Sequence, residues 1–244
     1  MDNNNSSVES MGSQEQKTKG HTPTIEEVDA DGQFSGHFNI KLLNEHLKRC
    51  IREGDGEVDM DEYIKIFQQL YKFFCMLGTV FGFIGSDVKS KIEILQGHRN
   101  GENTTHYETV EKMITFEKTT DYIHSNKETS GSRTFLRLHR SLIFVSMFLG
   151  KMDSIGDQDG ISRICKDAYA QTLAKFHPWL IQKGAGIAML GLPTKKDLIL
   201  KVSTNGPVES NEVGPLMQDV IRRTHQIYDQ CEELYTKHDL HSLP

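Results

Sequence analysis

Apolar positions along the chain recur at helical spacing over most of its length. Between residues 38 and 51, large apolar side chains stand at positions 38, 40, 42, 43, 47 and 51, which form one face of a helix. Stretches of the same kind predict helices over about 62–84, 87–96, 104–125, 133–150, 161–176 and 194–201. Two more helices are predicted to begin at Pro178 and Pro215. Proline suits the first turn of a helix, because the N–H that it lacks would have no hydrogen-bond partner there. No alternating run bounded by hairpin turns is present, so we expect an all-α fold.

Residues 1–35 differ from the rest in composition. They are rich in small polar residues, and seven acids against two lysines give them a charge of −5, out of −6 for the whole chain. Such a segment has too few large apolar side chains to offset the entropy lost on ordering. We therefore predict a disordered acidic tail over 1–35 and one domain over 36–244. The nearly neutral domain argues against a nucleic-acid binder, which would be basic.

The four cysteines, Cys50, Cys75, Cys165 and Cys231, are widely separated, and no CxxC motif is present. This spacing does not support a zinc ribbon, and it favours free thiols in a reducing compartment. The N-terminus lacks the basic and apolar regions of a signal peptide. The longest apolar run, 73–85, is too short to span a bilayer. We expect a cytosolic protein without a bound metal.

Three arginines stand at the start of a strongly apolar helix. Arg133, Arg137 and Arg140 are spaced i, i+4 and i+7, so they share one helix face, and the following residues 141–150 are almost all apolar. Buried arginines need partners, since an uncompensated internal charge costs several kcal/mol. Ion pairs with internal acids, or hydration at an exposed helix end, would provide these partners. An oxyanion site would also do so, because guanidinium forks match phosphate geometry.

Two other short patterns allow both a structural and a functional interpretation. Asp87 and Lys91 are spaced i,i+4, which fits an exposed salt bridge as well as a polar binding site. In "FHPWL" (176–180), His177 is compatible with a structural hydrogen bond or with ligand binding. Trp179, the single tryptophan, fits either a core position or the rim of a membrane-facing surface.

An acidic stretch before residue 62 resembles half of a calcium loop. With Glu62 at position 12, Gly56 takes the sharp turn, but position 1 falls on Ile51, where a carboxylate is needed. A calcium-binding module is therefore a distant alternative, and an acidic loop before a helix is favoured. GxSxG, P-loop, HExxH and GxGxxG motifs are absent. We expect a protein that is not an enzyme and has no cofactor.

Five motifs in order carry a resemblance to a known family. They are "DVKSK" (87–91), "RTFLRLHR" (133–140), "FHPWL" (176–180), "GLPTKKD" (191–197) and "LYTKHDLHSLP" (234–244). With this order and spacing, residues 37–244 resemble the glycolipid transfer protein superfamily, and within it the branch that binds ceramide-1-phosphate. The resemblance implies a two-layer helical sandwich around a hydrophobic lipid pocket, and transfer of phosphosphingolipids between membranes.

The resemblance also implies roles for single residues. Asp87 matches the acid that holds the sphingoid amide and hydroxyl, and His177 matches the histidine that binds the acyl carbonyl. Lys91, Arg133 and Arg137 match the cations that bind phosphate. Arg140 is a further candidate phosphate contact, and Trp179 matches the membrane-docking rim.

Departures from the glycolipid-binding branch favour a phosphate headgroup. That branch has asparagine, lysine and a sugar-stacking tryptophan where this chain has Lys91, Ile94 and Arg133. Cations suit a phosphate, whereas a sugar needs a flat aromatic face and amide hydrogen bonds. We expect ceramide-1-phosphate or a related phosphosphingolipid as ligand, transient contact with membrane surfaces, and no nucleic acid partner. A neutral glycosphingolipid carrier or lipid sensor is the alternative.

Overall fold

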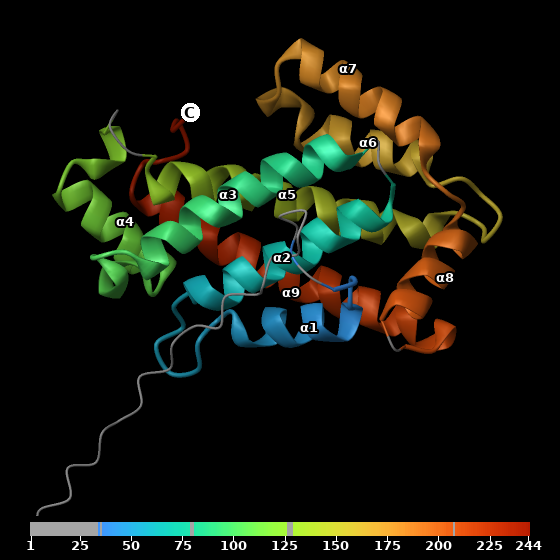
Figure 1. The fold of residues 1–244 in the computed structure, drawn as a ribbon, viewed down its shortest axis with the longest axis horizontal. Helices are drawn as coiled ribbons and strands as arrows, with labels where there is room; N and C mark the ends of the chain where they lie inside the picture. The colour runs from blue at the N-terminus through green and yellow to red at the C-terminus, as the bar shows by residue number, and fades with distance from the viewer. Residues whose placement is uncertain (1–33, 35, 79–80, 126–128, 207) are drawn as a thin grey trace, which may run out of the picture.

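The computed structural model describes residues 34, 36–78, 81–125, 129–206 and 208–244, and their regular secondary structure is helical (Figure 1). The prediction of an all-α fold is confirmed. No helix in this part of the chain is long and apolar enough to cross a membrane. The α-helices are α1 Ile40–Arg49, α2 Met60–Met76, α3 Gly82–Asn100, α4 Val110–Thr119, α5 Gly131–Lys151, α6 Ser162–Thr172, α7 Trp179–Ala188, α8 Lys195–Asn205 and α9 Ser210–Lys237. Short 3₁₀ turns lie at Thr104–Tyr107, Tyr122–His124, Met152–Ser154, Ala174–Phe176 and Met189–Gly191.

The helices form a two-layer sandwich with α5 at its centre. Helix α5 packs against α9, α6, α3 and α4, while α2 packs against α1 and α3, and α1 packs against α9. Figure 1 shows α7 and α8 toward one end of the molecule and α4 at the other. Because α5 contacts so many elements, its placement decides which side chains meet at the surface.

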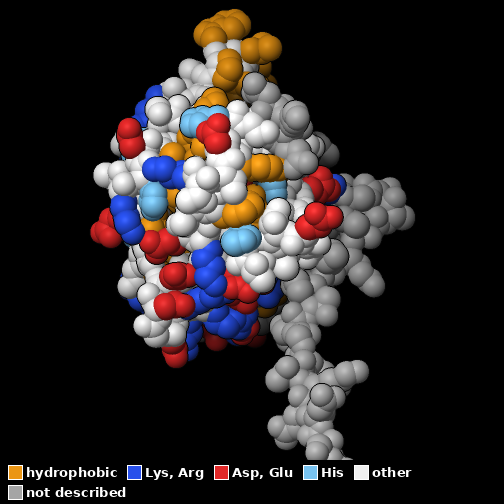
Figure 2. Space-filling model, turned by 90° about the vertical axis from the view of Figure 1, so that its left-hand side faces the viewer, with side chains coloured by type: hydrophobic (Ala, Val, Ile, Leu, Met, Phe, Trp, Pro, Cys, Tyr) orange, Lys and Arg blue, Asp and Glu red, His pale blue; other side chains and the backbone are white. Residues whose placement is uncertain are grey.

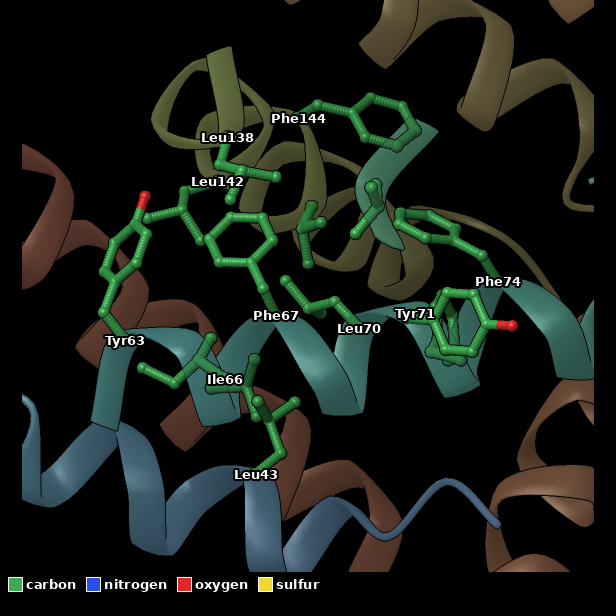
Figure 3. Close-up of a cluster of buried hydrophobic side chains, with 14 of the residues drawn as sticks. Leu43, Tyr63, Ile66, Phe67, Leu70, Tyr71, Phe74, Leu138, Leu142 and Phe144 are labelled. Atoms are coloured by element: carbon green, nitrogen blue, oxygen red, sulfur yellow. The ribbon is translucent and has the colours of Figure 1, made fainter. Parts of the chain in front are cut away.

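The core is built on both faces of α2. Figure 3 shows Ile66 of α2 directed toward Leu43 of α1, while Phe67 is directed toward α5. Tyr63 stacks on Phe135 of α5, with the ring centroids 4.2 Å apart and the planes inclined by 28°. A helix that is apolar on both faces is buried, which agrees with the apolar composition of residues 60–77.

A buried carboxylate holds the start of α5. The side chain of Glu117 is fully buried in α4 and accepts four hydrogen bonds. The donors are Tyr107 Oη (3.0 Å), Ser130 Oγ (2.6 Å), the Gly131 amide (2.7 Å) and the Ser132 amide (3.0 Å). The first amides of a helix lack internal partners and carry partial positive charge, so a carboxylate here stabilises the helix terminus.

Some predicted helix boundaries were wrong. The helix predicted over 62–84 ends at Met76, and α3 begins at Gly82 rather than near Asp87. Between them Gly78 has φ +118°, a conformation that glycine adopts readily and other residues rarely do. The amphipathic stretch 104–125 contains α4 flanked by two 3₁₀ turns rather than one helix.

The predicted start of α9 at Pro215 was also wrong. The helix begins at Ser210, where Glu209 and Glu212 form a capping box, so Pro215 lies inside the helix. A local cap outweighs the single backbone hydrogen bond that proline removes. At the other end of the chain, the predicted disordered tail lies outside the described residues except for Phe34. That side chain is buried edge-on against Tyr71, with centroids 5.3 Å apart.

Two carboxylates of the calcium-like stretch, those of Asp59 and Glu62, are engaged within the fold. Asp59 accepts a hydrogen bond from the amide of Glu62 as the N-cap of α2, and it pairs with Arg52 at 2.8 Å. Glu62 pairs with His46 at 2.8 Å and with Lys65 at 3.1 Å. Burial alone would raise the pKa of Glu62, but these two hydrogen bonds and the cationic charge outweigh it and hold the pKa at about 2. This stretch therefore shapes the entry into α2.

We expect Glu117→Gln to destabilise the fold by about 2–4 kcal/mol. The glutamine NH₂ group cannot accept the hydrogen bonds that one carboxylate oxygen accepts from these donors, so buried N–H and O–H groups would be left without partners. Glu111→Gln is the matched control on the same helix, since Glu111 forms a surface ion pair with Lys237. It should change the free energy of unfolding by less than about 1 kcal/mol. Chemical denaturation measures both, and equal effects would contradict the proposed role of Glu117.

Candidate functional site

A cleft opens between α3, α5 and the turn that leads into α7. It contains about 1290 Å³ of empty space, part of it open to solvent. Its polar lining comes from Asp87 and Lys91 on α3, Arg137 and Arg140 on α5, and His177 before α7. Five of the polar residues predicted from the sequence are therefore brought together from three segments.

The α3 side of the cleft carries an ion pair. Lys91 Nζ donates to the carboxylate of Asp87 one turn earlier. The two side chains differ in exposure, since Lys91 is 14% exposed and Asp87 67% exposed. The ammonium therefore lies inside the cleft wall, and the carboxylate lies at its edge.

The α5 side carries two guanidinium groups that donate to main-chain oxygens. Arg137 Nε donates to the Pro244 oxygen at 3.1 Å, and Arg140 Nη2 donates to the His241 oxygen at 2.9 Å. The guanidinium of Arg140 also lies 4.1 Å above the ring of Phe176. Burial lowers the pKa of Arg140, the Glu232 carboxylate raises it in part, and the charge of Arg137 lowers it further. An arginine keeps its proton under such conditions, so both groups are cations facing one cleft.

Arg133 is placed differently from the other predicted cations. It lies one turn before Arg137, and its Nη2 donates to the main-chain oxygen of Ser125 at 2.8 Å. Its Nε is buried without a hydrogen-bond partner in the described part of the chain. Arg133 does not line the described cleft, so its contact with a phosphate stays a prediction.

His177 is held by a residue that the sequence did not single out. Its Nδ1 lies 2.9 Å from the hydroxyl of Tyr169 on α6. Burial lowers the pKa of His177, Asp87 raises it in part, and Lys91 lowers it. The ring is therefore neutral near pH 7. If the Tyr169 hydroxyl donates to Nδ1, the proton resides on Nε2, which can then donate to a ligand.

Behind the polar mouth lies an apolar cavity. It contains about 700 Å³ of empty space and shares Asp87, Lys91, Arg137 and His177 with the cleft. Its deeper lining is apolar, from Phe74, Val88, Leu138, Phe144, Ala185 and Met189. A second apolar pocket of about 430 Å³ lies between α1, α2, α5, α8 and α9. Helical periodicity alone could not separate these lining residues from ordinary core.

An exposed apolar rim stands next to the cleft. Trp179 is 68% exposed and Leu180 72% exposed, at the start of α7, and Ile187 and Leu190 at its far end are similarly exposed. Figure 2 shows hydrophobic side chains protruding at the top of the molecule, where Figure 1 places α7. So large a group of exposed apolar side chains marks an interaction surface.

Comparison with known proteins identifies the family. Residues 58–204 match the glycolipid transfer protein family. The chain belongs to the glycolipid transfer protein family. It is 33% identical over 211 residues to the ceramide-1-phosphate transfer protein of Xenopus tropicalis, covering 85% of this chain and 97% of the relative. The Danio rerio protein of the same name is 35% identical, with coverages of 85% and 98%.

A solved structure of the same family has a similar fold. The human ceramide-1-phosphate transfer protein in complex with 2:0 ceramide-1-phosphate superimposes with a TM-score of 0.76 at 30% identity. The match covers 85% of this chain and all of the human chain. The predicted family and its helical sandwich are therefore confirmed.

Members of this family carry lipids, and the cleft lacks the parts of a metal site. In the described residues, no group of three or more His, Cys, Asp or Glu side chains could hold a metal ion. The four cysteines are free, and three of them are buried. The groups that line the cleft and the cavity are suited to bind an anion and hydrocarbon chains.

We expect His177 to titrate below the ordinary histidine pKa of about 6.5. The unfolded chain then binds this proton more tightly than the folded one, so His177 reduces stability as the pH falls below 6.5. Nitrogen-15 NMR at pH 7.5 should show the Nε2–H tautomer, and Tyr169→Phe should weaken that preference. An Nδ1–H tautomer in the unsubstituted protein would contradict this arrangement.

Proposed function

We propose that this protein binds ceramide-1-phosphate and carries it between membranes without a vesicle. The observation that supports it is a cluster of three cations, Lys91, Arg137 and Arg140, at the mouth of an apolar cavity. A phosphosphingolipid has the same order of parts, with an anionic head attached to hydrocarbon chains. The names of the relatives agree with this ligand.

The cations would bind the phosphate. Arg137 and Arg140 each use one N–H for a main-chain oxygen, so several donors of each guanidinium stay available. Hydrogen bonds to charged groups contribute about 1.5–3 kcal/mol each. Arg133 is proposed as a further phosphate ligand on the preceding turn of α5. Its unpartnered Nε is a donor that a ligand could engage.

The polar ceramide backbone would bind across the cleft from the arginines. The Asp87 carboxylate is mostly exposed and can accept from the sphingoid amide and hydroxyl. His177 can donate from Nε2 to the acyl carbonyl, with Tyr169 holding its Nδ1. These two contacts would recognise the ceramide part, while the cations distinguish phosphate from a sugar.

The apolar cavity would shield the hydrocarbon chains during transfer. Each CH₂ moved from water to an apolar site contributes about 0.8 kcal/mol, so a sixteen-carbon chain faces on the order of 13 kcal/mol in water. A protein sleeve removes most of that barrier. The ligand leaves chemically unchanged, so we propose a carrier that is not an enzyme.

The apolar rim would dock the protein on a membrane. Trp179 and Leu180 lie two and three residues after His177, so docking on this rim brings the mouth of the cleft to the lipid surface. Trp is favoured at the membrane interface because its ring is amphipathic. We propose a cytosolic protein that contacts membranes transiently.

Arg137→Ala should reduce transfer of fluorescent ceramide-1-phosphate between vesicles by roughly 10- to 100-fold, because it removes charge-assisted hydrogen bonds. Arg163→Ala on the exposed face of α6 is the matched control and should transfer normally. Fluorescent galactosylceramide, measured in parallel, should be transferred poorly by the unsubstituted protein. Efficient galactosylceramide transfer, or an indifferent Arg137→Ala variant, would favour the neutral-glycolipid carrier instead.

Trp179→Ala should slow transfer between vesicles about tenfold while leaving binding of a short-chain ceramide-1-phosphate in solution unchanged. The reason is that Trp179 is exposed and does not line the described cleft. A vesicle flotation assay measures docking, and calorimetry measures binding. Equal losses in both assays would show that Trp179 acts on the pocket rather than on the membrane.

A further inference from the structure

A short segment after α9 forms part of the cleft. Residues 240–244, here termed the strap, follow the last helix, and Pro244 lines the cleft beside Arg137 and Arg140. The sequence places these residues more than 100 positions after the arginines. Only the fold brings the strap and the arginines together.

A defined turn directs the strap toward the cleft. Asp239 has φ +56°, the left-handed conformation in which many helices end. The Leu240 amide donates to the Tyr235 oxygen at 2.9 Å, and the Asp239 amide donates to the Thr236 oxygen at 3.1 Å. This pair of hydrogen bonds is the Schellman motif. The direction in which the strap leaves α9 is therefore set by backbone geometry.

Two leucines anchor the strap. Leu240 is 5% exposed and Leu243 is 7% exposed, and both belong to the hydrophobic core. The Leu243 amide donates to the Leu240 oxygen at 3.2 Å. Ser242, between them, is exposed. The main-chain oxygens that follow or separate the leucines are thereby held at fixed positions.

These oxygens are the acceptors that orient the arginines. Among the described residues Arg137 donates to the protein through Nε alone, which leaves its two terminal nitrogens for a phosphate. Arg140 donates through Nη2 and lies on the Phe176 ring. The two cations repel each other, so without such acceptors their side chains would turn apart into solvent.

We infer that the strap positions Arg137 and Arg140 for phosphate recognition, with Leu243 as the anchoring residue next to Pro244. This inference rests on the proposed function of the same cleft. The strap would thus contribute to selectivity for a phosphate over an uncharged headgroup without itself touching the ligand's phosphate. In a competing arrangement, the strap oxygens occupy the place of the phosphate. Weakening the strap would then raise the affinity for the phosphate lipid instead of lowering it.

The test is equilibrium binding to the full chain of a ceramide-1-phosphate and a ceramide that share the same two-carbon acyl group. Leu243→Ala should lose about tenfold in affinity for the phosphate lipid, equal to about 1.4 kcal/mol, and less than about twofold for the ceramide. Leu243→Met should restore binding, and Ser242→Ala is the matched control that should bind normally. A variant that lacks residues 242–244 and is amidated at His241 removes the Pro244 oxygen without placing a carboxylate beside Arg140, and it should behave as Leu243→Ala does.

Each result bears on the inference. Tighter phosphate binding by Leu243→Ala would mean that the strap competes with the ligand, and equal losses for both lipids would mean a general structural role. Either outcome overturns the inference, as does unchanged binding by both strap variants. Thermal unfolding is followed in parallel. If Leu243→Ala is unstable, the deletion variant replaces it in the binding test. If the unsubstituted protein does not prefer the phosphate lipid, the proposed function fails and the inference fails with it.

Discussion

The hydrogen bonds between Glu117 and the first turn of α5 hold the helix on which the cleft depends. The carboxylate fixes where α5 starts and how it is rotated, and Gly131 fits there because an added Cβ would lie 2.9 Å from Met113 Sδ. From Gly131 the helix carries Arg137 and Arg140 into the cleft six and nine residues later, and then its apolar length into the core. A carboxylate buried in α4 therefore determines which α5 side chains a ligand meets.

The cleft solves the problem of keeping cations beside an apolar cavity. A guanidinium or ammonium with no partner in an apolar interior would cost several kcal/mol. Here Lys91 is paired with Asp87, while the arginines donate to main-chain oxygens at the solvent edge. These oxygens use one N–H of each guanidinium, so the arginines keep other donors for an anion. The apolar cavity behind them stays free of unpaired charge.

The residues proposed for lipid recognition and for membrane docking share one short segment. His177 lines the cleft, and the exposed Trp179 and Leu180 follow it at the start of α7. Ile181 lines the cleft again and is 40% exposed. The start of α7 thus links the surface that would meet a bilayer to the mouth that would receive a lipid. Movement of α7 on docking would therefore also move His177 and Ile181 in the cleft.

Local sequence determined the helical class, most helix positions and the pairing of Asp87 with Lys91, because periodicity and i,i+4 spacing act within a few residues. The ordered motifs also indicated the family, since they carry the residues that the resemblance assigns to its binding site. Local rules missed the start of α9, where a capping box outweighed Pro215. The tertiary structure alone decided that Tyr169 holds His177, and that Arg133 does not line the described cleft.

The strap shows why the remaining contacts of the cleft could not be predicted from the sequence. The oxygens that accept from Arg137 and Arg140 are main-chain atoms of residues 107 and 101 positions away. Main-chain oxygens occur at every residue, so no residue type marks these two. They are selected by the local turn at Asp239 and by burial of Leu243, and the packing of α9 against α5 decides which side chains they meet. Sequence patterns determine which groups are available, and long-range packing decides which of them meet.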